Sequence, residues 1–335
     1  MALNTVRTGV RKTVSNIRAR RVRMPSPAFL LSPSSKKAKT PDQRQLIAQM
    51  RRDGIIKLPG LVDPESLADM QAGIQRMADA ADQKRADPSY TDDVALEEMY
   101  AEESSYYYEA KWKYYTTIDP FKFSSGLARF VMRDELMGLV NTYYRKQAYL
   151  ARSIGFRMLP MTRPSGVYGW GWHHDAWGRK VNCTILLTEI GEDDQWVGYR
   201  KGSHLAHHPI EGHKGIQNFT DEEAEAKFGQ YELVKCTGKP GDVYMFDSNG
   251  LHSLMSSEGR VRDVYVLMFY CDRTFQFSQS LPEEIVHTAA PQDLRVYREM
   301  LKYNEWKQRT GESGISPRYG LGWKNTLFQF RHWLF

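Results

Sequence analysis

The spacing of apolar residues changes along the chain from a helical period to a strand period. Over 64–81 the apolar side chains Leu67, Met70, Ile74 and Met77 recur every three or four positions, which predicts an amphipathic helix. An Asp-Pro pair directly before them is a typical helix start. The other predicted helices are 41–52 (after the cap Thr40 and before Gly54), 120–149, 282–287 and 291–309.

From Ser153 onward the apolar segments are short, rich in β-branched and aromatic residues, and separated by turn residues. This pattern is typical of antiparallel strands. We therefore predict an α+β, mainly β fold whose core is a double-stranded β-helix, a cupin-like jelly roll, with bracing helices on one side. The predicted strands are 55–58, 154–158, 181–187, 196–199, 231–234, 243–246 and 264–270.

These elements predict one catalytic domain over 41–335, preceded by a basic arm over 1–40. The domain divides into a helical part (41–152), the jelly-roll core (153–275) and a helical and aromatic C-terminal extension (276–335). Within the helical part, 83–119 is first acidic and then aromatic. Such a segment is either a lid that closes over substrate or a packed insertion.

The formal net charge of +6 is concentrated at one end of the chain. Residues 1–40 hold ten basic side chains and no acidic one, so the remainder carries 6 − 10 = −4. This balance argues against a nucleic-acid groove across the domain. For the arm, three interpretations remain: a transit peptide, a weak contact with an anionic surface, or a tail that is solvated or packed on another subunit of a homodimer.

The cysteines and the hydropathy indicate a reducing compartment without a membrane anchor. Cys183, Cys236 and Cys271 are odd in number and lack metal-motif spacing, as expected where disulfides do not form. No apolar run approaches the ~18 residues of a membrane span. We expect a cytoplasmic protein, with organelle targeting by the arm as the alternative.

The candidate chemistry begins at His173 and Asp175, which stand two positions apart in an apolar segment. In a strand, such residues point to the same face. Further along, a Gly-Asp turn at Gly241 leads into a strand, and the loop after it delivers His252. Two histidines and one carboxylate with open positions form the facial triad of non-haem Fe(II) oxygenases.

Arg262 begins the next apolar strand, ten residues after His252. A guanidinium inside an apolar barrel needs an anionic partner, and a carboxylate bound by two parallel hydrogen bonds suits it best. 2-Oxoglutarate carries such a carboxylate at one end and a metal-chelating keto acid at the other. The spacing therefore points to Fe(II), 2-oxoglutarate and O2.

Four segments together resemble the phytanoyl-CoA dioxygenase-like family of Fe(II)/2-oxoglutarate-dependent oxygenases. They span roughly 45–270 and are Arg52 to Leu61 ("DG-strand-G"), Trp172 to Asp175, Gly202-Ser203-His204 ("GSH"), and Gly241 to His252 ("PGD…F…H"). The resemblance implies a jelly roll with iron held by His173, Asp175 and His252. It also implies that Arg262 binds 2-oxoglutarate.

The chain departs from the family pattern near the co-substrate site. The family's arginine usually sits about one residue further from the distal histidine, so Arg260 is a rival to Arg262. Two residues after that histidine the family often has serine, whereas this chain has Leu254, with Ser253 one position earlier. Asp194-Gln195 replaces the usual Asn-Gly pair. The remaining candidates are Thr184 and Ser253 for 2-oxoglutarate, and Trp172, His174, Trp177, Tyr107 and Trp112 for substrate.

We predict an enzyme that hydroxylates an unactivated C–H bond of a small organic or lipid-like molecule and releases succinate and CO2. One alternative keeps the cofactors but ends in desaturation, cyclisation or epimerisation. Another is a cupin-like protein that binds metal without turnover. The residues do not identify the substrate.

Overall fold

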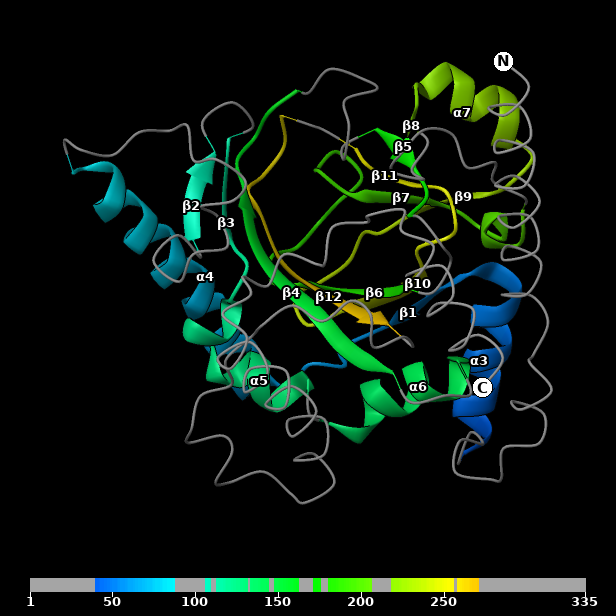
Figure 1. Cartoon of the computed structure of the whole chain (residues 1–335), viewed down its shortest axis with the longest axis horizontal. Helices are drawn as coiled ribbons and strands as arrows, with labels where there is room; N and C mark the ends of the chain where they lie inside the picture. Colours follow the sequence, from blue (N-terminus) through cyan, green and yellow to red (C-terminus); the bar gives the residue numbers. More distant parts are fainter. Residues whose placement is uncertain are drawn as a thin grey trace, which may run out of the picture.

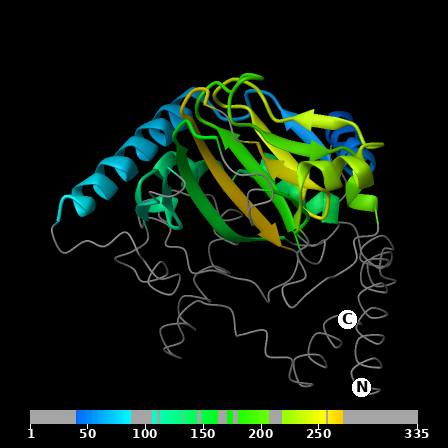
Figure 2. The ribbon, with the colours of Figure 1, turned by 90° about the horizontal axis from the view of Figure 1, so that it is seen from above.

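The structure, a computed structural model, consists of two facing antiparallel sheets with helices on the outer side of the larger one (Figures 1 and 2). It describes residues 40–87, 106–109, 113–131, 133–144, 148–162, 171–175, 180–206, 218–255 and 258–270. Several predictions lie outside these residues: the arm over 1–39, the part of the lid segment over 88–105, Trp112, Trp177, Cys271 and the extension over 276–335.

The larger sheet has seven strands in the order β1-β10-β6-β12-β4-β3-β2. Their bounds are β1 Ile55–Leu58, β2 Tyr106–Glu109, β3 Tyr114–Thr117, β4 Tyr149–Met158, β6 Lys180–Leu186, β10 Val243–Asp247 and β12 Arg262–Tyr270. The smaller sheet has five strands in the order β8-β5-β11-β7-β9. Its strands are β5 Trp172–His173, β7 Val197–Arg200, β8 Asn218–Phe219, β9 Leu233–Lys235 and β11 His252–Leu254. The predicted jelly-roll fold is confirmed.

Alternation along the strands divides the larger sheet into an outer and an inner face. On β12, Tyr265 and Leu267 point outward into a core shared with the helices. Val264 and Val266 point inward and pack with residues of the smaller sheet, including Tyr199. The inner face is therefore the wall of the space between the sheets.

The helices begin and end at the residues that cap them. Thr40 accepts a hydrogen bond from the Gln43 backbone and Gly54 ends the first helix with φ 77°, as expected for a left-handed C-cap. Asp63 caps the second helix through the Ser66 backbone. The helices are α3 Pro41–Asp53, α4 Pro64–Arg85, η3 Pro120–Lys122, α5 Ser125–Val131, α6 Asp134–Tyr144, η4 Ser203–Leu205 and α7 Asp221–Phe228.

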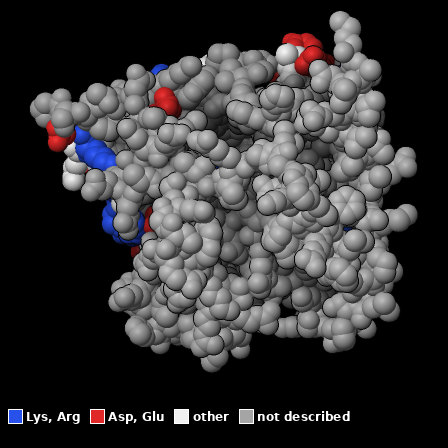
Figure 3. All heavy atoms as spheres, in the orientation of Figure 1, with Lys and Arg blue, Asp and Glu red and all other residues white. Residues whose placement is uncertain are grey.

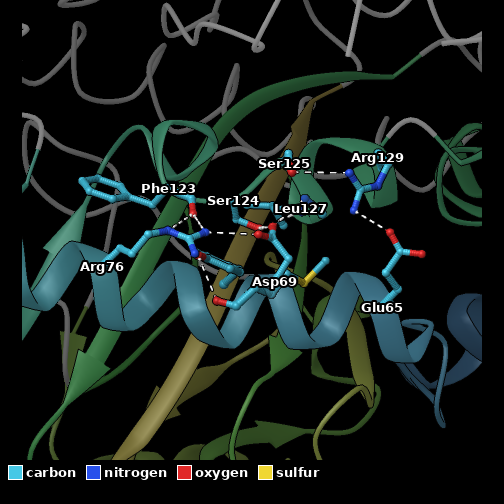
Figure 4. Close-up of polar contacts among 11 residues, drawn as sticks. Glu65, Asp69, Arg76, Phe123, Ser124, Ser125, Leu127 and Arg129 are labelled. Atoms are coloured by element: carbon cyan, nitrogen blue, oxygen red, sulfur yellow. Dashed lines mark hydrogen bonds and ion pairs between the residues drawn. The ribbon is translucent and has the colours of Figure 1, made fainter. Parts of the chain in front are cut away.

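A partly buried carboxylate joins α4 to the start of α5 (Figure 4). Asp69 Oδ2 accepts hydrogen bonds from Ser124 Oγ and from the Gly126 backbone, both at 2.7 Å. Arg76 bonds the other Asp69 oxygen and the Phe123 carbonyl. An acidic group at a helix N-terminus is favourable, so Asp69 explains why a new helix starts at Ser125.

The element predictions differ from the structure at several elements. The helix α7 and the short strands β5, β8 and β11 were not predicted. The helix predicted over 120–149 is three shorter helices, and its last residue, Tyr149, already begins β4. Two parts of the acidic and aromatic segment 83–119, Tyr106–Glu109 and Tyr114–Thr117, form the antiparallel strand pair β2–β3 at the edge of the larger sheet. The physical reason is pairing: Tyr114 to Thr117 lie against Met158 to Gly155 of β4, a partner that local sequence does not reveal.

Figure 3 shows charged side chains of the described residues at separate places on one side of the molecule. Acidic side chains gather over α7, whose first turn holds Asp221, Glu222 and Glu223 (Figure 3). Basic side chains lie along α4 at another edge (Figure 3). Of the helices in the described part of the chain, none is long and apolar enough to cross a membrane.

Candidate metal centre

The smaller sheet brings the two candidate histidines together. His173 of β5 and His252 of β11 are directly paired across the antiparallel strands, and their ring centroids are 4.4 Å apart. Asp175 follows β5, and its backbone N–H donates to the Ser248 carbonyl at 2.7 Å. One ligand atom from each of these three side chains lies within 4.8 Å of the others.

The hydrogen bonds of the histidines leave the same nitrogen available on each ring. His173 Nδ1 bonds the Gly171 carbonyl and His252 Nδ1 bonds the Gly250 carbonyl, both at 2.8 Å. A carbonyl accepts only, so Nδ1 carries the proton and Nε2 keeps its lone pair. Burial, the larger cause, and the neighbouring His173 together lower the pKa of His252 to about 3. This low pKa keeps the imidazole neutral.

Asp175 is the negative charge of the centre. Burial by itself would raise the pKa of its carboxyl, but Lys180, His252 and His173 outweigh burial and hold this pKa well below its usual range. The Lys180 ammonium lies 2.5 Å from Asp175 Oδ2. Asp175 is therefore ionised, as a metal ligand must be.

The GSH turn holds the loop that leads to His252. Ser203 Oγ accepts a hydrogen bond from the Leu251 backbone at 2.8 Å. Asn249 donates to the His204 carbonyl at 2.8 Å, and His204 Nε2 lies 3.1 Å from the Arg51 carbonyl at the end of α3. The turn is thus placed to support the metal centre.

The buried residues Asp247 and Tyr199 form a hydrogen-bonded group with the partly buried Tyr143 beneath the same loop. Tyr143 donates to Asp247 Oδ2 at 2.6 Å, and the Tyr199 hydroxyl donates to the Asp247 carbonyl at 3.0 Å. Burial raises the pKa of the Asp247 carboxyl. A Cβ added at Gly250 would lie 1.9 Å from the Tyr199 hydroxyl, so this position of the loop must be glycine.

The two rival arginines lie in different surroundings. Arg260 is 57% exposed in its side chain and forms an ion pair with Asp194, with Nη2–Oδ2 2.7 Å. This hydrogen bond is the main cause that lowers the pKa of Asp194 to about 2. Arg262 is buried on the inner face of β12, where Nη1 lies 3.0 Å from the Met158 sulfur. Only Arg262 points into the space between the sheets.

The two other co-substrate candidates differ in their orientation. Thr184 of β6 is buried and belongs to the inner face, between Tyr244 of β10 and Val266 of β12. Ser253 is buried beside His252 in β11. Since side chains alternate along a strand, Ser253 lies on the face opposite to His252.

The substrate candidates that the structure describes also differ in where their side chains lie. The Trp172 ring packs with Phe219, Phe228 and Leu251 in a hydrophobic cluster, on the other side of β5 from His173. His174 is buried next to the two ligands. Tyr107 of β2 belongs to the inner face, because it is paired with Thr116, which is paired with Phe156 of the inter-sheet core.

Sequence reasoning did not single out Lys180, Asp247 or Tyr143. A signal for Lys180 was present, because the polar residues Lys180, Asn182 and Thr184 alternate with apolar ones along β6. Such alternation predicts a strand with one polar face. Tyr143 and Asp247 come from α6 and β10, and nothing in the sequence indicates their contact.

The donor set fits Fe(II). Two neutral imidazoles with free Nε2 atoms and one ionised carboxylate converge from one side, which leaves the remaining positions of an octahedral ion for other ligands. Asp175 Oδ2 is buried, and the Lys180 ammonium faces it as an ion-pair partner. A structural zinc site would instead close its coordination with a fourth protein ligand.

The chain is similar to known proteins in sequence and in fold. An ectoine dioxygenase from Nocardia farcinica (strain IFM 10152) is 24% identical over 223 residues, covering 60% of this chain and 68% of its own. The crystal structure of the epimerase SnoN in complex with Fe3+, alpha ketoglutarate and nogalamycin RO has a TM-score of 0.53 at 17% identity, covering 75% of this chain and 90% of that one.

A second solved structure has the same fold. EctD from S. alaskensis with 2-oxoglutarate and 5-hydroxyectoine has a TM-score of 0.51 at 19% identity, covering 72% of this chain and 79% of that one. The family described as Phytanoyl-CoA dioxygenase (PhyH) matches residues 50–254, more than half of the chain. The predicted cofactors, Fe(II), 2-oxoglutarate and O2, are those of this family. The chain belongs to the phytanoyl-CoA dioxygenase family of Fe(II)/2-oxoglutarate-dependent oxygenases.

Proposed function

We propose that the protein hydroxylates an unactivated C–H bond of a small organic molecule. The observation that carries this proposal is that His173, Asp175 and His252 converge between the sheets. The buried Arg262 points into the same space from β12. Iron bound there would supply, with 2-oxoglutarate and O2, the oxidising power for the reaction and release succinate and CO2. The protein supplies binding, orientation and exclusion of water.

Each of the three ligands has a defined role in this proposal. His173 and His252 bind iron through Nε2, because the carbonyls of Gly171 and Gly250 hold the opposite nitrogens. Asp175 supplies the anionic oxygen. The pairing of the two histidines across β5 and β11 fixes their separation before the metal binds, which lowers the cost of assembling the site.

Arg262 binds the distal carboxylate of 2-oxoglutarate in this proposal. It is 4% exposed and lies on the inner face, whereas the side chain of Arg260 is 57% exposed. Thr184, on the same face, is the second candidate contact. A buried guanidinium and a carboxylate form a strong, directional pair, so Arg262 would select a dicarboxylate co-substrate and aim its keto acid at the iron.

The strand pair β2–β3 supplies an aromatic wall for the substrate. The rings of Tyr107 and Tyr114 lie 6.5 Å apart, and Tyr114 meets Phe156 edge to face at 5.7 Å. Burial is the main cause that raises the pKa of the Tyr107 hydroxyl, and the charges of Glu109 and Arg152 also act on it. This wall therefore combines apolar surface with ionisable groups. These features fit a small molecule that has both kinds of surface. The solved relatives are described with the small molecules nogalamycin RO and 5-hydroxyectoine.

Product analysis tests the proposal. Small molecules are screened for stimulation of succinate release by the iron-loaded protein. Each compound that stimulates it is then reacted under 18O2, and the mass of its product is measured by mass spectrometry. Hydroxylation adds one labelled oxygen atom. A loss of two hydrogens would indicate desaturation or cyclisation, and an unchanged mass with altered stereochemistry would indicate epimerisation. Absence of succinate under every condition would favour a metal-binding protein without turnover.

A further inference from the structure

A buried lysine stands beside the candidate iron ligand Asp175. Lys180 is the first residue of β6, and its side chain is 10% exposed. The Lys180 carbonyl accepts hydrogen bonds from the Ser248 backbone at 3.0 Å and from Ser248 Oγ at 2.9 Å. The Ser248 carbonyl in turn accepts from the Asp175 backbone at 2.7 Å. Ser248 therefore fixes the two charged residues side by side.

The lysine contacts the carboxylate oxygen that faces the other ligands. Lys180 Nζ lies 2.5 Å from Asp175 Oδ2, and this same oxygen lies 3.8 Å from His252 Nε2. Donor atoms that share one metal at bonds of about 2.0–2.2 Å lie roughly 3 Å apart. A metal ion held by these donors would thus approach Asp175 Oδ2, the oxygen that the Lys180 ammonium contacts.

We propose that Lys180 is an internal cation that competes with iron for Asp175. The ammonium neutralises the buried carboxylate when no metal is bound, which makes the metal-free site more stable. When metal is bound, the ammonium repels it and shares its ligand oxygen. Both effects weaken metal binding, so removal of the charge should strengthen it. The inference rests on the metal centre proposed above and goes beyond it.

A different role predicts the opposite sign. If Lys180 only orients Asp175 for the metal, its removal leaves the carboxylate misplaced and metal affinity falls. The sign of the change in affinity therefore separates competition from simple positioning. Activity alone does not separate them, since either role changes turnover.

The test is an anaerobic titration of the full-length protein with Co(II), read by the visible absorption of the bound ion and by calorimetry. For Lys180→Met we expect Co(II) to bind roughly tenfold to a hundredfold more tightly than to the wild type, the range of one charged hydrogen bond. Lys180→Arg keeps the charge, and its affinity should not exceed that of the wild type.

A matched control lies on the same sheet. Lys57 of β1 pairs with Asp242 Oδ2 at 2.8 Å, away from the three ligands, so Lys57→Met should change Co(II) affinity by less than about twofold. If Lys180→Met does not fold, Lys180→Gln removes the charge and keeps a donor. Tighter binding by Lys180→Gln supports the proposal.

Equal or weaker Co(II) binding by the uncharged Lys180 variant would overturn the competition. A wild type that binds no Co(II) would be a different failure, because it would remove the metal centre and with it the proposed function. A wild type that binds Co(II) with no gain in the variant leaves the metal centre intact and rejects only the role of Lys180.

Discussion

Arg260 and Arg262 are two positions apart, yet the structure gives them different environments. For Arg262→Ala we expect the KM for 2-oxoglutarate to rise roughly tenfold to a hundredfold, the effect of losing a charge-assisted hydrogen bond. Arg260→Ala loses only its exposed pair with Asp194 and should leave this KM nearly unchanged. Initial rates against 2-oxoglutarate concentration, measured for both variants, give the ranking. A larger effect for Arg260→Ala would transfer the role to that residue.

Asp194 offers a test of pH dependence away from the metal ligands. Its pKa of about 2 lies below its usual value, chiefly because Arg260 donates to it. A depressed carboxyl pKa stabilises the fold above the unfolded pKa of about 3.9, and the stabilisation is lost as pH falls through the folded pKa. Asp194→Asn should thus be less stable than the wild type at neutral pH, and the gap in denaturant midpoint should narrow as the pH falls from about 4 to about 2. A gap independent of pH would show that the charge of Asp194 is not its cause.

At the scale of elements, the loop between β10 and β11 connects the fold to the metal centre. A Cβ at Gly250 would collide with the Tyr199 hydroxyl, so Gly250→Ala should lower the free energy of unfolding by about 1–3 kcal/mol, as overpacking does. It should also weaken metal binding, because the Gly250 carbonyl holds His252. The measurements are urea denaturation and Co(II) titration.

Gly138 provides the control for this prediction. It lies within α6, and a Cβ there would meet no atom within 4 Å. Because alanine favours a helix over glycine by about 1 kcal/mol, Gly138→Ala should be neutral or stabilising and should leave Co(II) affinity unchanged. Equal losses of unfolding free energy and of Co(II) affinity in Gly250→Ala and Gly138→Ala would mean that the Gly250 effect is not specific to the loop.

Local sequence predicted α3 and α4 but missed α7, although Thr220 and Glu223 form a capping box at its start. Thr40, Gly54 and Asp63 cap helices as expected, and His173, Asp175 and His252 meet as their spacing indicated. The strand pair β2–β3 was not predicted, because its strands gain stability from β4, far along the chain. Lys180 was missed for a similar reason: its proximity to Asp175 depends on Ser248, which comes from another strand connection.

At the scale of the whole molecule, the basic arm is separate from the matched family region. The family match starts at residue 50, and the first described helix starts at Pro41 behind its own cap. We expect a chain lacking residues 1–38 to fold, bind iron and turn over a small substrate at nearly the full rate. Circular dichroism, iron content and succinate release measure these three properties. A truncated protein that binds iron but loses turnover would place the arm in the active site, for example across a dimer.

The central claim is that iron held by His173, Asp175 and His252 oxidises a substrate while 2-oxoglutarate is consumed. The most direct measurement loads the wild type and His252→Ala with Fe(II) anaerobically, adds 2-oxoglutarate and O2, and follows iron content and succinate. We expect slow succinate formation by the wild type without added substrate, and neither retained iron nor succinate in the variant. Wild-type protein that holds its iron in the presence of O2 and consumes no 2-oxoglutarate, or a variant that retains iron and turnover, would contradict the claim.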